Sequence, residues 1–193
     1  RLDKNTTGIM LTAKTDEAHW RLSLQFERRT IQKTYLAVAH GQFDLDGDTI
    51  DAPIGVHPVV REKFAVFVIQ NKIDIAKDAI THYEVAERYR GYTLVKLQPK
   101  TGRTHQLRVH LSHIGHPIVG DTMYGGKAVS EMDLTGAGST EPMIVHQALH
   151  AWKIAFRHPI TEKFMELEAP FHGPFKRLVQ TLRSSRSLGE RAK

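Results

Sequence analysis

The sequence predicts an α+β fold: a single domain with a mixed, largely antiparallel β-sheet flanked by helices and loops. Two pairs of alternating segments, turned at Arg90-Gly91 and at His158-Pro159, predict β-hairpins. Between them the apolar period changes from two to between three and four, which indicates a helix. The chain has 193 residues, enough for one sizeable core, because a fold of this size buries roughly 70% of its unfolded surface.

The amino-terminal segments predict a strand and a helix. Residues 9–13 are apolar and follow a polar Thr-Thr-Gly turn, which predicts a short buried strand. Thr15 or Asp16 can cap a helix. Apolar residues recur every four positions in that helix, as at Leu22 and Phe26, and form the face that we expect to be buried.

The rest of the chain follows the same two patterns. The irregular segments 71–79 and 130–142 predict loops, the second of them mobile, and the last ten residues are expected to fray. Further strands are predicted at residues 31–41, 63–69, 80–89, 92–99, 148–156 and 163–169, and helices at 175–183 and around Leu107, Leu111 and Ile114, ending at Gly115.

The composition indicates a soluble protein with a polyanionic partner. There are 27 Lys and Arg against 21 Asp and Glu, a formal charge of +6. No apolar run approaches the ~18 residues that a membrane span needs, so we expect no membrane partner. The absence of cysteine excludes a disulfide framework, cysteine-ligated zinc and a thiolate nucleophile, and fits a cytoplasmic location. Because no methionine precedes Arg1, we expect a fragment or a processed form.

Two stretches are recognisable as motifs. "RLDKNTTG" (residues 1–8) and "LQPKTGRTHQLRVHLSHIGHPIVGDTMYGG" (97–126) resemble the "HRLDxxTSG" motif and the second signature of the RluA-type pseudouridine synthases. "KTYLAVAHG" is similar to that family's tyrosine strand, and "QALHAWKIAFRHPIT" to its C-terminal hairpin. The resemblance spans residues 1–175, with the motifs in family order. It departs from the family at Thr7, where serine is usual, and in lacking the histidine and the strands expected upstream of Arg1.

The resemblance implies a pseudouridine synthase fold and an enzyme that isomerises specific uridines in structured RNA by base flipping. Residues 1–175 would be the catalytic domain without its N-terminal part, and residues 176–193 a C-terminal basic helix and tail. The isomerisation oxidises nothing and loses no group, so no cofactor is expected. Large-subunit ribosomal RNA is the expected partner, with transfer RNA as the alternative, and a monomer is the simplest assembly.

The resemblance also implies three catalytic residues. Asp3 would supply the carboxylate that acts at the sugar, and Arg108 would lie within a few ångströms of it as an ion pair that keeps it ionised. Tyr35 would stack on the extruded uracil, and its hydroxyl would assist loss of the proton on C5. From the residues alone, Asp3 could equally cap a turn, Arg108 could be a solvated helix residue and Tyr35 could be core.

Three further residues are predicted to bind RNA. Arg1 would fill the gap that the flipped base leaves in the stack, Arg103 would bind phosphate near the start of the second helix, and Leu97 would form an apolar wall of the pocket. The simpler alternatives are a terminal arginine in solvent, a surface charge and ordinary core packing, respectively.

Other functions fit the residues less well. Four histidines lie between residues 105 and 116, but on a helix His105 and His110 point about 140° apart; with no acidic ligand at suitable spacing, no metal is expected. A non-catalytic RNA-binding module would explain the basic charge, and replacing Asp3 would separate it from an isomerase. A methyltransferase acting on C5 of the pyrimidine would need a cysteine nucleophile, which the chain lacks.

Overall fold

The computed structural model describes residues 1–67 and 76–190. Its helices are α1 (Asp16–Glu27), α2 (Gln106–His113), the 3-10 turn η1 (Thr122–Tyr124), α3 (Glu131–Thr135) and α4 (Gly173–Glu190). Its strands are β1 (Thr7–Gly8), β2 (Gln32–His40), β3 (Gly47–Asp51), β4 (Ile54–Val56), β5 (Phe64–Val66), β6 (Ala76–Lys77), β7 (Ile80–Tyr89), β8 (Tyr92–Pro99), β9 (Val129–Ser130), β10 (Pro142–Ile144), β11 (Leu149–Arg157) and β12 (Phe164–Glu168).

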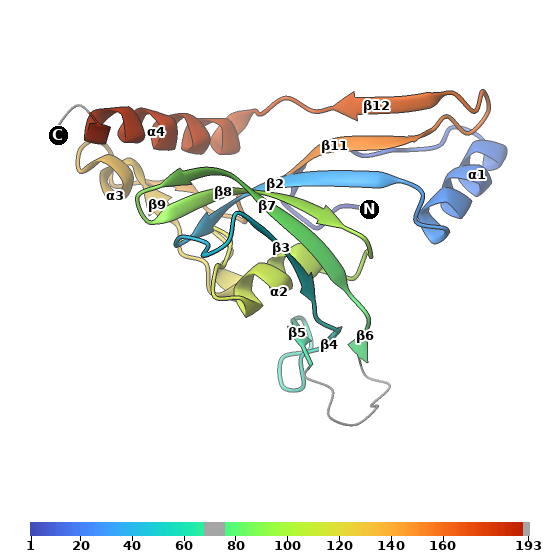
Figure 1. Ribbon diagram of the computed structural model, residues 1–193, viewed down its shortest axis with the longest axis horizontal. Coiled ribbons are helices and arrows are strands. Elements are labelled where there is room, and N and C mark those ends of the chain that lie inside the picture. The colour runs from blue at the N-terminus through green and yellow to red at the C-terminus, as the bar shows by residue number, and fades with distance from the viewer. Residues whose placement is uncertain (68–75, 191–193) are drawn as a thin grey trace.

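The main sheet has seven strands in the order β1-β11-β2-β8-β7-β3, with β12 paired to β11 beside β1. Every pairing in it is antiparallel except that of β1 with β11. Figure 1 shows α1 and α4 at opposite ends of this sheet and the small sheet of β4, β5 and β6 projecting from it. The predicted α+β fold with a mixed, largely antiparallel sheet is confirmed.

The core forms around the central strand β2. Ala37 and Val38 point to opposite faces of the sheet, and both are fully buried, so the sheet is covered on both sides. Leu107 and Leu111 of α2 belong to the same apolar cluster, as do Phe175, Leu178 and Leu182 of α4. The predicted apolar stripe of α2 therefore does anchor that helix to the sheet.

Several local predictions are confirmed. Thr15 caps α1 by accepting a hydrogen bond from the Ala18 amide, and the two hairpins form as β7–β8 and β11–β12. Gly115 has φ +83 just beyond α2, as a helix stop requires. The strand predicted at 63–69 is present as Phe64–Val66, and residues 68–69 lie outside the described part.

Three local predictions are wrong. Residues 9–13 form no strand, because the paired segment is Thr7–Gly8 just before them. The segment 130–142 is not a featureless loop, since Ser130 and Asp133 form a reciprocal capping box that starts α3. The last helix is longer than predicted and runs to Glu190. Of the loop predicted at 71–79, residues 71–75 lie outside the described part, and Ala76–Lys77 is strand β6.

A fully buried histidine ties α2 to the sheet. His110 Nε2 donates to the carbonyl of Ala52 at 2.9 Å, so its Nδ1 accepts from the Thr81 hydroxyl, also at 2.9 Å. That hydroxyl in turn accepts from Gln106 Nε2 at 2.9 Å. In this neutral form both ring nitrogens are paired, and burial lowers the pKa of His110.

We expect this histidine to make the fold sensitive to acid. An unfolded histidine has a pKa of about 6.5, whereas His110 holds its neutral form to lower pH, so the unfolded state binds the proton first. Stability should therefore be full above that value and decline as the pH falls through and below it. Melting temperatures between neutral pH and mild acid test this, and His110→Gln, which keeps a donor and an acceptor, should flatten the profile. An unchanged slope in that variant would contradict the assignment.

Candidate active site

The amino-terminal segment is fixed to the sheet by contacts of Gly8 and of the Thr7 side chain. Gly8 pairs with Ala151 and has φ +112, and a Cβ there would collide with the Ala151 carbonyl. The Thr7 hydroxyl lies 2.8 Å from His150 Nδ1. His150 Nε2 donates to the Ala169 carbonyl at 3.1 Å, so Thr7 must be the donor to Nδ1. The threonine that departs from the family pattern thus makes the hydrogen bond that a serine could make.

The turn that follows Asp3 is also held in place. The Thr6 amide donates to the Asp3 carbonyl at 3.0 Å, and Asn5 takes the left-handed conformation with φ +70. Gln147, just before β11, donates to the Lys4 carbonyl at 2.6 Å. Asp3 uses its backbone for this turn, which leaves its carboxylate free to face the cavity described below.

A buried glutamine shapes the loop that leads into α2. Gln106 Oε1 accepts from the Thr101 hydroxyl at 2.7 Å and from the Arg103 amide at 3.0 Å. Its Nε2 donates to the Ile80 carbonyl at 3.0 Å. The Arg103 side chain donates from Nε to the Asp78 carbonyl at 2.9 Å. These bonds fix the loop against the start of β7 and hold Arg103 at its edge.

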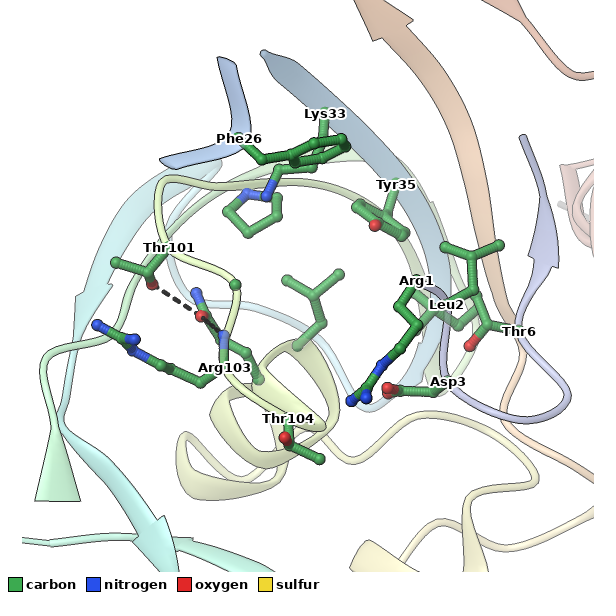
Figure 2. A pocket seen from close by; sticks show the side chains of 15 residues that line it. Arg1, Leu2, Asp3, Thr6, Phe26, Lys33, Tyr35, Thr101, Arg103 and Thr104 are labelled. Carbon is green, nitrogen blue, oxygen red and sulfur yellow. Dashed lines mark hydrogen bonds between the residues drawn. The ribbon is translucent and has the colours of Figure 1, made fainter. Parts of the chain in front are cut away.

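The fixed amino-terminal segment, β2 and the α2 loop enclose a cavity of about 240 Å³. Four predicted site residues line it: Arg1, Asp3, Tyr35 and Arg103. Figure 2 shows the side chains of Arg1 and Asp3 pointing toward one another, with Tyr35 above them and Arg103 across the opening. The structure therefore brings together residues from three segments that are far apart in the sequence.

Tyr35 is positioned as a protonated phenol. Its side chain is largely but not fully covered, and burial together with the negative charge of Asp3 raises its pKa to about 12. The ring lines the cavity and is not sealed in the core. At neutral pH the hydroxyl therefore carries its proton and can donate a hydrogen bond to a ligand.

We expect the charge of Asp3 to be measurable at Tyr35. In Asp3→Asn the pKa of Tyr35 should fall, because the carboxylate that disfavours the phenolate is gone while the burial stays. The test is a pH titration by NMR of protein with ¹³Cζ-labelled tyrosine, with the Tyr35 signal assigned by Tyr35→Phe. Identical titration curves in the parent and in Asp3→Asn would mean that the two groups are not electrostatically coupled.

The predicted ion pair between Asp3 and Arg108 is wrong. Arg108 is buried and forms a bidentate pair with Asp121, with Nε and Nη2 each 2.7 Å from a carboxylate oxygen. Its guanidinium also lies over the ring of Tyr124, 4.9 Å from the centroid. Among the described residues no ion pair joins Arg108 to Asp3. Both hydrogen bonds of the guanidinium therefore go to Asp121, which lies within the second signature itself.

The electrostatic link between Asp3 and Arg108 nevertheless persists at longer range. Burial disfavours the charged guanidinium, but the hydrogen bonds and charge of Asp121 and the charge of Asp3 outweigh it and raise the pKa of Arg108. Asp3 acts likewise on His105, where burial and Arg108 lower the pKa and Asp3 opposes them. Arg108 is thus a buried cation that does not line the cavity, and Asp121 holds it in place.

Leu97 does not form a wall of the cavity. It is fully buried in the main core and lies opposite Tyr35 on the neighbouring strand. The apolar side chains that line the cavity are Leu2, Phe26, Pro99, Leu107 and Leu149. The simpler alternative, core packing, holds for Leu97.

Sequence reasoning missed Asp121, Phe26 and Lys33. Asp121 stands in the otherwise apolar and glycine-rich run "PIVGDTMYGG", and a carboxylate buried there needs a cation. Lys33 precedes Tyr35 by two residues, so strand alternation places both on one face. Nothing in the sequence indicated that Phe26 lines a cavity, because its helical spacing predicted a core residue. In the described part of the chain, no three His, Asp or Glu side chains lie together as metal ligands would.

Comparison with known proteins decides the family. A model of the family described as RNA pseudouridylate synthase matches residues 1–113. The chain belongs to the RNA pseudouridylate synthase family. The pseudouridylate synthase relatives include the ribosomal large subunit pseudouridine synthase D of Pseudomonas aeruginosa, 44% identical over 190 residues that cover 96% of this chain and 56% of that protein. An uncharacterized RNA pseudouridine synthase of Bacillus subtilis is 40% identical over 185 residues, covering 96% and 55%.

Solved structures show the same pseudouridylate synthase fold. Human RNA pseudouridylate synthase domain containing 4 superposes with a TM-score of 0.71 at 28% identity, covering 96% of this chain and 74% of that one. Domain containing 1 gives 0.69 at 27% identity, covering 95% and 78%. The chain spans about half the length of the curated bacterial relatives it matches. In the described residues, no helix combines the length and the apolar character needed to cross a bilayer.

Proposed function

We propose that this chain carries the catalytic site of an RNA pseudouridine synthase and isomerises uridine to pseudouridine in structured RNA. The observation that carries the proposal is the open carboxylate of Asp3 in a cavity that also holds the Tyr35 ring and Arg1. Membership of the pseudouridylate synthase family supports it. The cavity gives a flipped base an aromatic surface, an anion and a cation at once.

The chemistry requires few groups. The bond from N1 to C1′ breaks, the base turns, C5 bonds to C1′, and a proton leaves C5 while N1 gains one from solvent. Atoms and electrons balance without an oxidant or a donor, so no cofactor is needed. Asp3 would stabilise the positive charge that develops at C1′, whether or not a covalent bond forms.

Tyr35 and Arg1 would act on the base. The ring of Tyr35 offers a surface on which the extruded uracil can stack. Its hydroxyl is protonated in the free site, because burial and Asp3 raise its pKa to about 12. When the charge of Asp3 is consumed at C1′, one cause of that shift disappears, and the phenol gives up its proton to solvent more easily. The resulting phenolate would then accept the proton that leaves C5. Arg1 would occupy the gap in the stack, and Arg103 would contact phosphate.

We further propose large-subunit ribosomal RNA as the substrate class and the cytoplasm as the location. The relatives from Pseudomonas aeruginosa and Escherichia coli, 44% and 42% identical, are named ribosomal large subunit pseudouridine synthases. The formal charge of +6 suits a polyanion. The described part of the segment 176–193, which belongs to α4 and ends at Glu190, would remain part of the same unit, because Leu178 and Leu182 are buried in the main core.

Release of tritium tests the proposal. RNA transcribed from a large-subunit ribosomal gene, with tritium at C5 of uridine, should lose label to water when incubated with the protein and no added cofactor. Transfer RNA labelled in the same way measures the alternative substrate class. Full retention of label in both RNAs would overturn the proposed activity.

A further inference from the structure

Phe26 lies on the apolar face of α1 but is not buried in the core. Leu22, one turn earlier, is buried in a small core with Ile154 and Phe156. Phe26 lies on the same helical face, yet it is 43% exposed. Its ring instead lines the cavity that holds Asp3 (Figure 2). An aromatic ring kept half in solvent at a cavity rim gains little for folding and is available to a ligand.

Lys33 is a cation without a counter-charge beside that ring. It lies two residues before Tyr35 on β2, and its ammonium is 3.8 Å from the position that a Cβ on Gly102 would take. Among the described residues, no acidic side chain is within ion-pair distance of it. Burial and the charge of Arg29 lower its pKa. An anion bound at Lys33 would stabilise the charged ammonium, which burial and Arg29 disfavour.

A second hollow, of about 70 Å³, borders the main cavity at these two residues. The lining residues that the two hollows share are Arg1, Leu2, Phe26, Lys33 and Tyr35. Phe26 and Lys33 are therefore accessible from both hollows. Beyond the shared residues the second hollow opens toward Met10, which is 57% exposed.

We propose that Phe26 and Lys33 form a second RNA subsite, which holds the nucleotide next to the target uridine. Phe26 packs against the base of that nucleotide, and Lys33 binds the phosphate that links it to the target. Aromatic stacking and a single cation are the two elements by which proteins hold unpaired nucleotides. The subsite rests on the proposed function, because its ligand is continuous with the target uridine.

Binding measurements separate the two roles. Fluorescence anisotropy with a labelled ribosomal RNA stem-loop, carrying a loop uridine, gives the Kd as a function of salt. Lys33→Met should weaken binding and reduce the slope of log Kd against log salt by about 0.7 to 0.9, the value of one phosphate contact. Phe26→Leu should weaken binding about fivefold or more without changing the slope, and Phe26→Trp should restore affinity.

Matched controls come from the start of β12 and the residue before it. Lys163→Met and Phe164→Leu change an exposed lysine and an exposed phenylalanine that line neither cavity, and both should leave Kd and slope unchanged. An RNA with an abasic residue beside the loop uridine should remove the difference between the parent and Phe26→Leu. Thermal unfolding by circular dichroism checks that each variant is folded.

The outcomes distinguish the subsite from the proposed activity. If the parent releases tritium but Lys33→Met keeps the parent slope and Phe26→Leu the parent affinity, the subsite is overturned and the activity stands. If the parent binds RNA with the expected dependence on both residues but releases no tritium, the subsite stands and the activity is overturned. A response to Phe26→Leu that persists with the abasic RNA would mean that the ring supports the fold or another partner, and would also overturn the subsite.

Discussion

Asp3→Asn is expected to abolish release of tritium from C5-labelled RNA, with a loss of at least about 1,000-fold. Asparagine keeps the size and the hydrogen-bonding outline of the side chain but carries no negative charge. The turn that positions residue 3 uses its backbone carbonyl and not its carboxylate, so the segment should stay in place. What is lost is the anion that faces the cavity beside Tyr35.

The same variant decides between an isomerase and a pure RNA-binding module. Affinity for the ribosomal stem-loop, measured by anisotropy, should stay near that of the parent, because removing one anion from a basic surface does not oppose phosphate binding. Asp44→Asn is the matched control, since Asp44 is exposed and lines no part of the cavity. Parental turnover in Asp3→Asn would rule out the carboxylate as the catalytic group.

The parts of the fold that could be predicted are those with a local signal. The β7–β8 hairpin shows its alternation and its Arg90-Gly91 turn in one continuous stretch, and α1 shows its cap at Thr15. Residues 9–13 misled because apolar side chains can be buried without strand pairing: Ile9 and Leu11 pack against the small core, while the ladder with β11 uses Thr7–Gly8. That pairing is parallel and joins residues more than 140 positions apart, which no local pattern reveals.

The candidate site likewise contains residues that could be predicted from the sequence and residues that could not. Asp3 and Tyr35 could be placed from their motifs, and the structure sets both in one cavity. Leu97 was predicted on the correct strand, but its exposure depends on what covers that face of the sheet. Arg108 was paired with Asp3 from the family resemblance, but in the structure it pairs with Asp121, and nothing local in the sequence marks that contact. The capping box of α3 was visible as Ser130 followed three residues later by Asp133 and was overlooked.

Asp121→Asn is expected to lower the free energy of unfolding by about 3 to 5 kcal/mol, because it leaves the buried guanidinium of Arg108 without a counter-charge. The Asp121 and Arg108 side chains are only 1% and 7% exposed, so water cannot replace the lost partner. The charge-assisted bonds at 2.7 Å would become neutral ones, which are weaker. Urea unfolding at neutral pH measures the loss, and a decrease below about 1 kcal/mol would place the pair among weak surface bridges.

The double variant Arg108→Met with Asp121→Leu separates stability from catalysis. Replacing a buried ion pair by apolar side chains of similar volume is often neutral, so the double variant should recover most of the free energy that Asp121→Asn loses. It also removes a positive charge that interacts with Asp3 at longer range. If that charge contributes to catalysis, the folded double variant should release tritium more slowly than the parent. Equal rates in the two proteins would mean that Arg108 and Asp121 serve only to fasten α2 to η1.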